Sequence, residues 1–465
     1  MNSRFNRTRR VIPAAKEFSV ISAVGDWLTV IFGLTVTTTV RFVGDLPVGE
    51  IVVLALVVPI FVMYHNRALR ADLRILYGLQ ILWLLGQILT DIYRQTPQID
   101  WLRGNAGIVF FIMDLVFVAM LMAGNEKRKI LFIASYAIGS IISTRLFPTA
   151  FSVNYPWKFG YANGVNLLCL LSAGYFFNKK KYSIALLLLL GISAVNLADN
   201  FRSPVLLMLV TIALTIPVIP EYVGPWRVLP PQGSRMRLFA LIALALSAGL
   251  VASALVKTMA SAGYLGEVAQ QKNEVQTHVK GGLLIGGRPE IVVSSRAVLD
   301  SPILGHGSWA RDYRYIEVLH DVMRSYGLEQ QQDVDSMEED TQGIIPTHSH
   351  LMEAWVYAGI AGAVFWFYLL WYALKLISQL PLKQPPFAPV FMFLCIDNVW
   401  AILFSPFGST RRIMESFLII MTFDLLRNFN VQAGFRLPFR QNTWRRGQFV
   451  APEKRLPHNV ALPRT

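Results

Sequence analysis

The feature that most constrains this chain is a series of long apolar runs joined by mostly short polar connections. A segment needs about 20 mainly apolar residues to cross the roughly 30 Å hydrocarbon core of a bilayer. Twelve runs fit that template, at 18–40, 48–65, 73–90, 105–124, 129–147, 160–178, 182–199, 203–221, 237–258, 351–377, 387–405 and 413–427. The sequence therefore predicts an all-α, polytopic integral membrane protein with about twelve transmembrane helices.

The composition agrees with this prediction. Of the 465 residues, 54% are hydrophobic and only 15% are charged, whereas soluble domains carry about 25% charged residues. An ordinary soluble enzyme and a disordered or fibrous chain are both excluded. The two cysteines, Cys169 and Cys395, lie inside apolar runs, so neither a disulfide framework nor a thiolate metal site is expected.

The basic residues predict on which side of the membrane each loop lies. They gather at the N-terminus and in alternate loops: Arg4, Arg7, Arg9, Arg10 and Lys16; Arg67, Arg70 and Arg74; Lys127, Arg128 and Lys129; Lys179, Lys180 and Lys181; Arg227, Arg235 and Arg237; Lys375 and Lys383; and the tail from Arg427 to Arg464. The positive-inside rule places this set and both termini in the cytoplasm. The net charge of +14 then reflects membrane orientation, and nucleic acid is not an expected partner.

The predicted organisation has five parts. They are a cytoplasmic N-terminus (1–17), nine transmembrane helices (18–258), a large outer loop (259–350), three further transmembrane helices (351–427) and a basic cytoplasmic tail (428–465). Within the outer loop, apolar residues at helical spacing over 289–299 and 313–326 predict short helices, while 330–341 is polar and acidic. This loop should form a helical cap over the outer end of the bundle.

A particular group of arginines on the predicted outer face stands out, against the positive-inside trend: Arg202, Arg288, Arg411 and Arg412. Cations at that surface favour an anionic ligand. Arginine suits phosphate because its planar guanidinium donates bidentate hydrogen bonds and stays charged. His348 and His350 lie on the same predicted face, and a histidine can take up a proton near neutral pH. The pair has no cysteine and no convincing third ligand nearby, which argues against a metal site.

The motifs around these residues resemble those of the O-antigen ligase and O-antigen polymerase superfamily. The matching residues are Gly287-Arg288, then Ser301-Pro302-Ile303-Leu304-Gly305-His306-Gly307, then Thr347-His348-Ser349-His350-Leu351-Met352-Glu353 with Gly359-Ile360-Ala361-Gly362. The predicted layout, with one large outer loop between helices nine and ten, extends the likeness over nearly the whole chain. The chain departs from the family pattern where Val292 or a neighbour replaces the usual Trp and where Ser349 replaces the usual Asn.

The resemblance implies a GT-C-like bundle in the bacterial inner membrane and an inverting, metal-independent glycosyl transfer at its periplasmic face. The donor would be a glycan on undecaprenyl diphosphate, the acceptor a sugar hydroxyl of a glycan or glycolipid, and no cofactor is implied. Either ligase or polymerase activity, in lipopolysaccharide or exopolysaccharide biosynthesis, would fit. By position, Arg202 and Arg288 would contact the diphosphate. His348 would be the general base, with His350 as the alternative and an apparent pKa near 6.5.

These roles require Arg202, Arg288 and one of the two histidines to surround a single space. Other interpretations fit the same residues. Arg202 matches an arginine that extends to lipid phosphates, and Arg288 could pair with Glu290. Arg411 and Arg412, the further candidates for diphosphate contact, could instead anchor the last helix. A transporter or flippase of lipid-linked sugars is the alternative function, although no two-fold internal similarity is visible.

Overall fold

The computed structural model describes residues 14–41, 44–216, 235–264, 266, 270, 288–325, 343–379 and 387–432. Predictions that concern Gly287, the acidic segment 330–341 and most of the basic tail therefore lie outside the described residues. Within the described part, regular structure is almost entirely helical. Strands β1 (Thr39–Arg41) and β2 (Asp45–Pro47) form one small antiparallel pair between the first two helices.

The described helices coincide with the predicted segments. In chain order they are α1 (Ala14–Thr35), α2 (Val48–Ala68), η1 (Ala71–Leu73), α3 (Arg74–Arg94), α4 (Gln98–Met122), α5 (Glu126–Leu146), α6 (Ala150–Asn154), η2 (Trp157–Tyr161), α7 (Ala162–Asn178), α8 (Tyr182–Ala198), α9 (Arg202–Thr215), α11 (Arg235–Ser261), α14 (Glu290–Asp300), α15 (Tyr313–Ser325), α17 (His350–Ala358), α18 (Ile360–Gln379), α19 (Ala388–Phe404) and α20 (Ser409–Gln432). Each predicted run overlaps one or two of them, so its helical character is confirmed where the structure describes it; the 18–40 run, however, ends in β1, and 217–221 lie outside the described residues.

Several of these helices are long and apolar enough to cross a membrane. Six described helices meet that standard, namely Val48–Ala68, Ala71–Arg94, Gln98–Met122, Glu126–Leu146, Leu238–Ser261 and Ile360–Gln379. Four shorter apolar helices accompany them, at Ser22–Thr35, Tyr182–Ala198, Arg202–Thr215 and Ala388–Phe404. The chain is thus an all-α, multi-pass membrane protein. A full set of twelve crossings stays a prediction.

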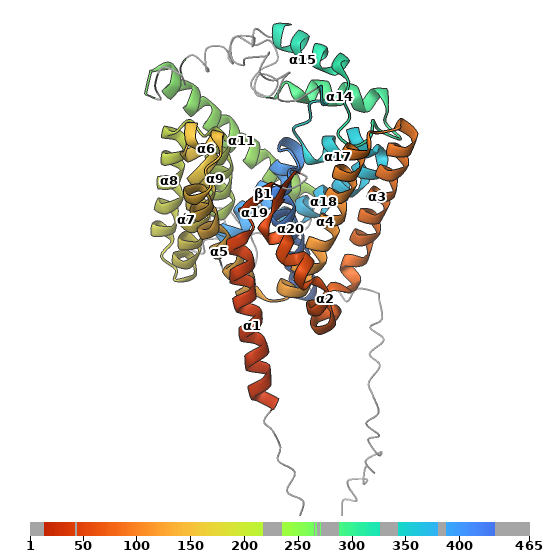
Figure 1. Cartoon of the computed structure of the whole chain (residues 1–465). Helices are drawn as coiled ribbons and strands as arrows, with labels where there is room; N and C mark the ends of the chain where they lie inside the picture. Colours follow the sequence, from red (N-terminus) through yellow and green to blue (C-terminus); the bar gives the residue numbers. More distant parts are fainter. Residues whose placement is uncertain are drawn as a thin grey trace, which may run out of the picture.

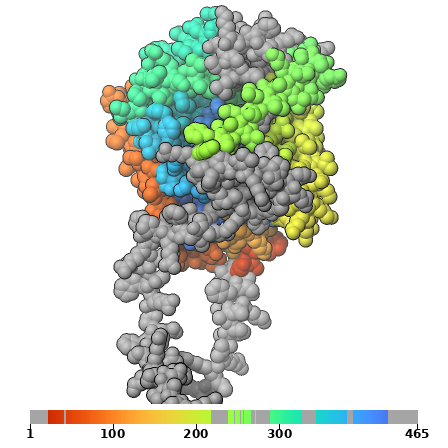
Figure 2. Space-filling view, turned by 180° about the vertical axis from the view of Figure 1, so that it is seen from behind, coloured from red at the N-terminus to blue at the C-terminus, as the bar shows by residue number. Residues whose placement is uncertain are grey.

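The helices form one bundle with a helical cap at one end. Figure 1 shows α14 and α15 at this end, and the first turn of α1 and the lower end of α2 at the other. Helix α11 packs mainly on α9 and α18, and Figure 2 shows it on the outside of the bundle. Only 7% of its most apolar window is buried inside the protein, which is the expected character of a helix that faces lipid.

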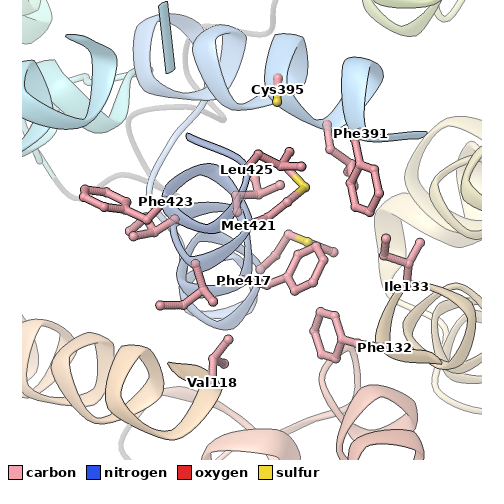
Figure 3. Packing of buried hydrophobic residues seen from close by; sticks show 14 of the residues in the cluster. Val118, Phe132, Ile133, Phe391, Cys395, Phe417, Met421, Phe423 and Leu425 are labelled. Atoms are coloured by element: carbon pink, nitrogen blue, oxygen red, sulfur yellow. The ribbon is translucent and has the colours of Figure 1, made fainter. Parts of the chain in front are cut away.

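Helix α20 lies at the centre of the bundle. Every residue from 413 to 426 is buried, because α4, α18 and α19 pack on this helix and side chains of α5 contact it. Phe417 packs against Phe132 of α5 with ring centroids 4.8 Å apart, and Figure 3 shows Val118, Phe391 and Cys395 in the same cluster. The buried stretch also includes polar side chains, among them Glu415 and Asp424, and buried charges need partners inside the protein.

The end opposite the cap holds basic residues that we predicted to share one side of the membrane. Asp424, near the end of α20, accepts from Nζ of Lys129 and from the backbone N–H of Gly124, both at 2.7 Å. Arg70, in the connection between α2 and α3, also pairs with Asp424. Two of the basic loops therefore do lie together, held by a buried carboxylate.

The predicted helix 351–377 is broken at Gly359, which differs from our expectation of one continuous span. Gly359 has φ 62° and ψ −150°, a conformation that is essentially restricted to glycine. A Cβ atom there would lie 1.9 Å from the carbonyl oxygen of Ile303. The break thus lets the outer loop approach the helix backbone directly.

Backbone hydrogen bonds join the two segments at this break. The N–H of Ile360 donates to the carbonyl of Ile303 at 3.1 Å, and the N–H of His306 donates to the carbonyl of Val356 at 2.7 Å. Gly305, with φ 79°, would place a Cβ atom 2.6 Å from the backbone nitrogen of Gly359. Gly305 and Gly359 are therefore explained by one close backbone contact, which we call the 303–360 junction.

Substitution of Gly359 should destabilise the protein. Gly359→Ala imposes a strained backbone, which costs about 1–3 kcal/mol, and adds a clash with Ile303. We expect a loss of at least about 2 kcal/mol, measured as a lower melting temperature of the detergent-purified protein. Gly191→Ala in α8 is the control, because no heavy atom lies within 4 Å of the added Cβ. Equal melting temperatures for the two variants would contradict the junction.

Candidate functional site

Arg288 enters the candidate site from the cap. It stands two residues before α14, whose buried face (Val293, Ala297 and Val298) packs against α15 and α17 in the cap's own apolar cluster. Helix α14 therefore holds Arg288 in place from one side, and the 303–360 junction that follows α14 fixes the helix to α17.

The segment 347–350 is held on the bundle by Ser349. The Ser349 hydroxyl donates to the carbonyl of Ile402 at 2.8 Å and accepts from the N–H of Met352 at 3.1 Å, so it also caps α17. These two bonds fix the backbone between the two histidines. Ser349 thus has a positional role.

The two histidines have different surroundings. His350 is completely buried and lies on Trp366 and Phe407, with ring centroids 4.9 and 5.2 Å away. His348 is only partly buried. A base that reacts with a bound molecule must be accessible, so the geometry favours His348 over His350, which belongs to an aromatic cluster in the protein interior.

His348 and Arg288 share one electrostatic environment. Burial and, secondly, the positive charge of Arg288 lower the pKa of His348 to about 4. The value near 6.5 that we expected from the sequence therefore does not describe the ligand-free protein. A histidine with this pKa is neutral at pH 7 and keeps an acceptor lone pair. Arg288 is thus in electrostatic range of His348.

Arg288 has no ion partner among the described residues. Burial lowers the pKa of its guanidinium, and the charge of Glu290 opposes this shift. However, no hydrogen bond or salt bridge joins the two side chains in the part of the chain that the structure describes, and Oε2 of Glu290 lacks a hydrogen-bond partner there. Glu290 therefore acts on Arg288 through its charge and not through a hydrogen bond.

Lys158 is a cation of this site that our sequence analysis missed. Burial and, secondly, the charge of Arg288 lower the pKa of its ammonium group. Lys158 lies in η2, a short π-helix between α6 and α7. A lysine on the predicted outer face, against the positive-inside trend, was the available signal.

Arg202 begins α9, whose first turn lies at the end of the bundle that carries the cap (Figure 1). Its Nε donates to Oδ1 of Asn200 at 3.0 Å. The preceding residue, Phe201, donates its N–H to the carbonyl of Asn196 at 2.8 Å. The side chain of Asn196 in turn accepts from Nε1 of Trp157 at 3.1 Å. Asn196 thus connects the Arg202 segment to the Lys158 segment.

Arg411 and Arg412 already have carboxylate partners. Arg411 bonds to Asp397 at 2.8 Å and to Glu415 at 3.0 Å, and Arg412 makes a bidentate pair with Glu50 at 2.6 and 2.8 Å. Because these carboxylates occupy the guanidinium donors, the geometry favours the interpretation of both arginines as anchors of α20 over that of phosphate ligands.

The described residues also bear on cofactors. Among them, no group of three or more His, Cys, Asp or Glu side chains is arranged to hold a metal ion. The candidate site is built from cations and one neutral histidine, which suits an anionic organic ligand.

No protein-family model matches the chain, and no curated protein matches it.

The position of Arg288 makes a prediction about the titration of His348. In ¹³C-histidine NMR spectra, with the signal assigned by His348→Gln, His348 should titrate near pH 4. Arg288→Gln should raise this pKa, because it removes a positive charge that disfavours the imidazolium. Arg296→Gln should not, because Arg296 is an exposed residue of α14 that pairs with Asp300. An unchanged pKa in Arg288→Gln would show that the two groups do not interact.

Proposed function

We propose that this protein is a membrane glycosyltransferase of the O-antigen ligase or polymerase type. It transfers a glycan from undecaprenyl diphosphate to a sugar hydroxyl at the periplasmic face of the bacterial inner membrane. The observation that carries the proposal is the pairing of Arg288, which has no ion partner among the described residues, with the partly buried and neutral His348. The resemblance of the surrounding motifs supports it.

The proposed reaction uses these groups in one displacement step. His348 accepts the proton of the acceptor hydroxyl, and the oxygen attacks the anomeric carbon from the face opposite the diphosphate. The bond between the anomeric carbon and the diphosphate oxygen breaks, and its electron pair leaves with the diphosphate. Arg288 and Arg202 stabilise the charge that develops there, which fixed guanidinium groups achieve without a metal. The configuration at the anomeric carbon is inverted.

The proposal also fixes the topology. The twelve helices cross the membrane, both termini and the basic loops lie in the cytoplasm, and the 259–350 loop lies in the periplasm. The polyprenyl tail of the donor stays in lipid while its diphosphate reaches the arginines from the side. The gathering of basic loops around Asp424, at the end opposite the cap, supports this orientation.

Substitution of the site residues should abolish transfer. With purified protein and glycan-linked undecaprenyl diphosphate, we expect Arg288→Ala and His348→Ala each to lower kcat about 10²- to 10³-fold, as the loss of an electrostatic stabiliser or a general base does. The assay contains EDTA, because the proposed mechanism uses no divalent cation.

Arg296→Ala is the matched control, because it removes an exposed arginine from the same helix. Two results would contradict the mechanism: full activity of His348→Ala, or activity that EDTA abolishes and a divalent cation restores. Movement of the lipid-linked sugar across vesicles without formation of a glycosidic bond would favour the transporter alternative.

The low pKa of His348 predicts two different pH profiles. In the free enzyme the base is protonated only near pH 4, so kcat/KM should stay high until the pH falls toward that value. A bound diphosphate is an anion close to the imidazole and raises its pKa. The acid limb of kcat should therefore lie at higher pH than that of kcat/KM. Coincident limbs would contradict a shared site for His348 and the diphosphate.

A further inference from the structure

We propose that Lys158 is a third cation of the diphosphate site and that it mainly stabilises the diphosphate as it leaves the sugar. This inference rests on the proposed function. Neither the motifs nor the arginine pattern identified this lysine. The contacts that fix η2 and the cations near it support the assignment.

Contacts on two sides fix the segment that carries Lys158. On one side, Nε1 of Trp157 donates to Oδ1 of Asn196, whose amide group also donates to Oδ1 of Asn166 at 2.8 Å. On the other side, Gly160 lies so close to α5 that a Cβ atom would be 2.6 Å from Cγ2 of Thr144. Helix η2 is thus wedged between α5 and α8, and Lys158 lies between these two contacts. Short π-helical turns are often found at functional sites.

The same hydrogen-bond network leads to Arg202. Asn196 binds Trp157 through its side chain and the N–H of Phe201 through its carbonyl, at 2.8 Å. Phe201 directly precedes Arg202. The backbone that carries Lys158 and the backbone that carries Arg202 are therefore fixed to one buried amide, so the two cations have a defined spatial relation.

Lys158 and Arg288 are two positive charges in electrostatic range of each other. Among the described residues Lys158 has no salt bridge to a carboxylate, and Arg288 is in electrostatic range of Glu290 without a hydrogen bond to it. Nζ of Lys158 lies 4.7 Å from the centre of the Phe159 ring, which does not neutralise it. Bringing two partly buried like charges together is unfavourable unless an anion lies between them. By contrast, Arg411 and Arg412 have carboxylates as direct partners.

A diphosphate is the anion that fits this arrangement. It carries negative charge on two adjacent groups, and it gains one further negative charge when the bond to the sugar breaks. Arg202 and Arg288 suffice to hold the intact donor, whereas a third cation matches the charge that appears in the transition state. A group with this role acts more on kcat than on KM.

The test measures binding of undecaprenyl diphosphate, which carries the charge of the leaving group, to the full-length protein in phosphatidylcholine nanodiscs. Undecaprenyl monophosphate, inorganic diphosphate and phosphatidylglycerol are the comparison ligands. Lys158→Ala and Lys158→Gln should each weaken binding of undecaprenyl diphosphate about tenfold and binding of the monophosphate less, while Lys158→Arg should bind nearly as wild type. In the transfer assay, Lys158→Ala should lower kcat with little change in KM.

Lys179→Ala is the matched control, because Lys179 also lies over an aromatic ring, that of Tyr175, at the other end of α7. Unchanged binding in both Lys158→Ala and Lys158→Gln, with weaker binding in Arg288→Ala, would overturn the role of Lys158 and leave the proposed function in place. Equal competition by phosphatidylglycerol would assign Lys158 to general lipid contact and also overturn it. Failure of the wild-type protein to bind undecaprenyl diphosphate would overturn both proposals.

Discussion

The close backbone contact between the outer loop and Gly359 is the interaction on which the candidate site depends. Arg288 lies before one partner of this contact, and His348 lies before the other. Two glycines make the approach possible, because any side chain at Gly305 or Gly359 would collide with the opposite backbone. The contact requires a break in the helix, and the break frees backbone groups that then bond to the loop. Non-helical backbone near a membrane is tolerated only where its polar groups find such partners.

Charge pairing inside the bundle distinguishes structural cations from candidate ligand cations. Buried ions are stable only with partners, and Arg411, Arg412 and Lys129 each have carboxylate partners. Lys158 and Arg288 stand apart, since they lie in electrostatic range of each other and neither forms a salt bridge among the described residues, although the charge of Glu290 acts on Arg288. A site that lacks its counter-ion is arranged to receive one, and this asymmetry is the physical basis of the proposed function.

The sequence predicted the helices well because long apolar runs report directly on the cost of burying polar groups in lipid. It did not predict the break at Gly359, which depends on contact with a loop some fifty residues earlier. It also left His348 and His350 as alternatives, because only packing shows that Trp366 and Phe407 enclose one of them. Lys158 and the low pKa of His348 were missed for the same reason, since both depend on the spatial position of Arg288.

The central claim is that one site, formed by cations from the cap and from the bundle, binds the diphosphate of a polyprenyl carrier. The most direct measurement is a cryo-electron microscopy structure of the protein with undecaprenyl diphosphate bound. The account predicts the two phosphates within hydrogen-bonding distance of Arg288 and Arg202, the prenyl chain leaving sideways into lipid, and His348 beside the terminal phosphate. Density for the headgroup at the opposite end of the bundle, or contact only with Arg411 and Arg412, would contradict it.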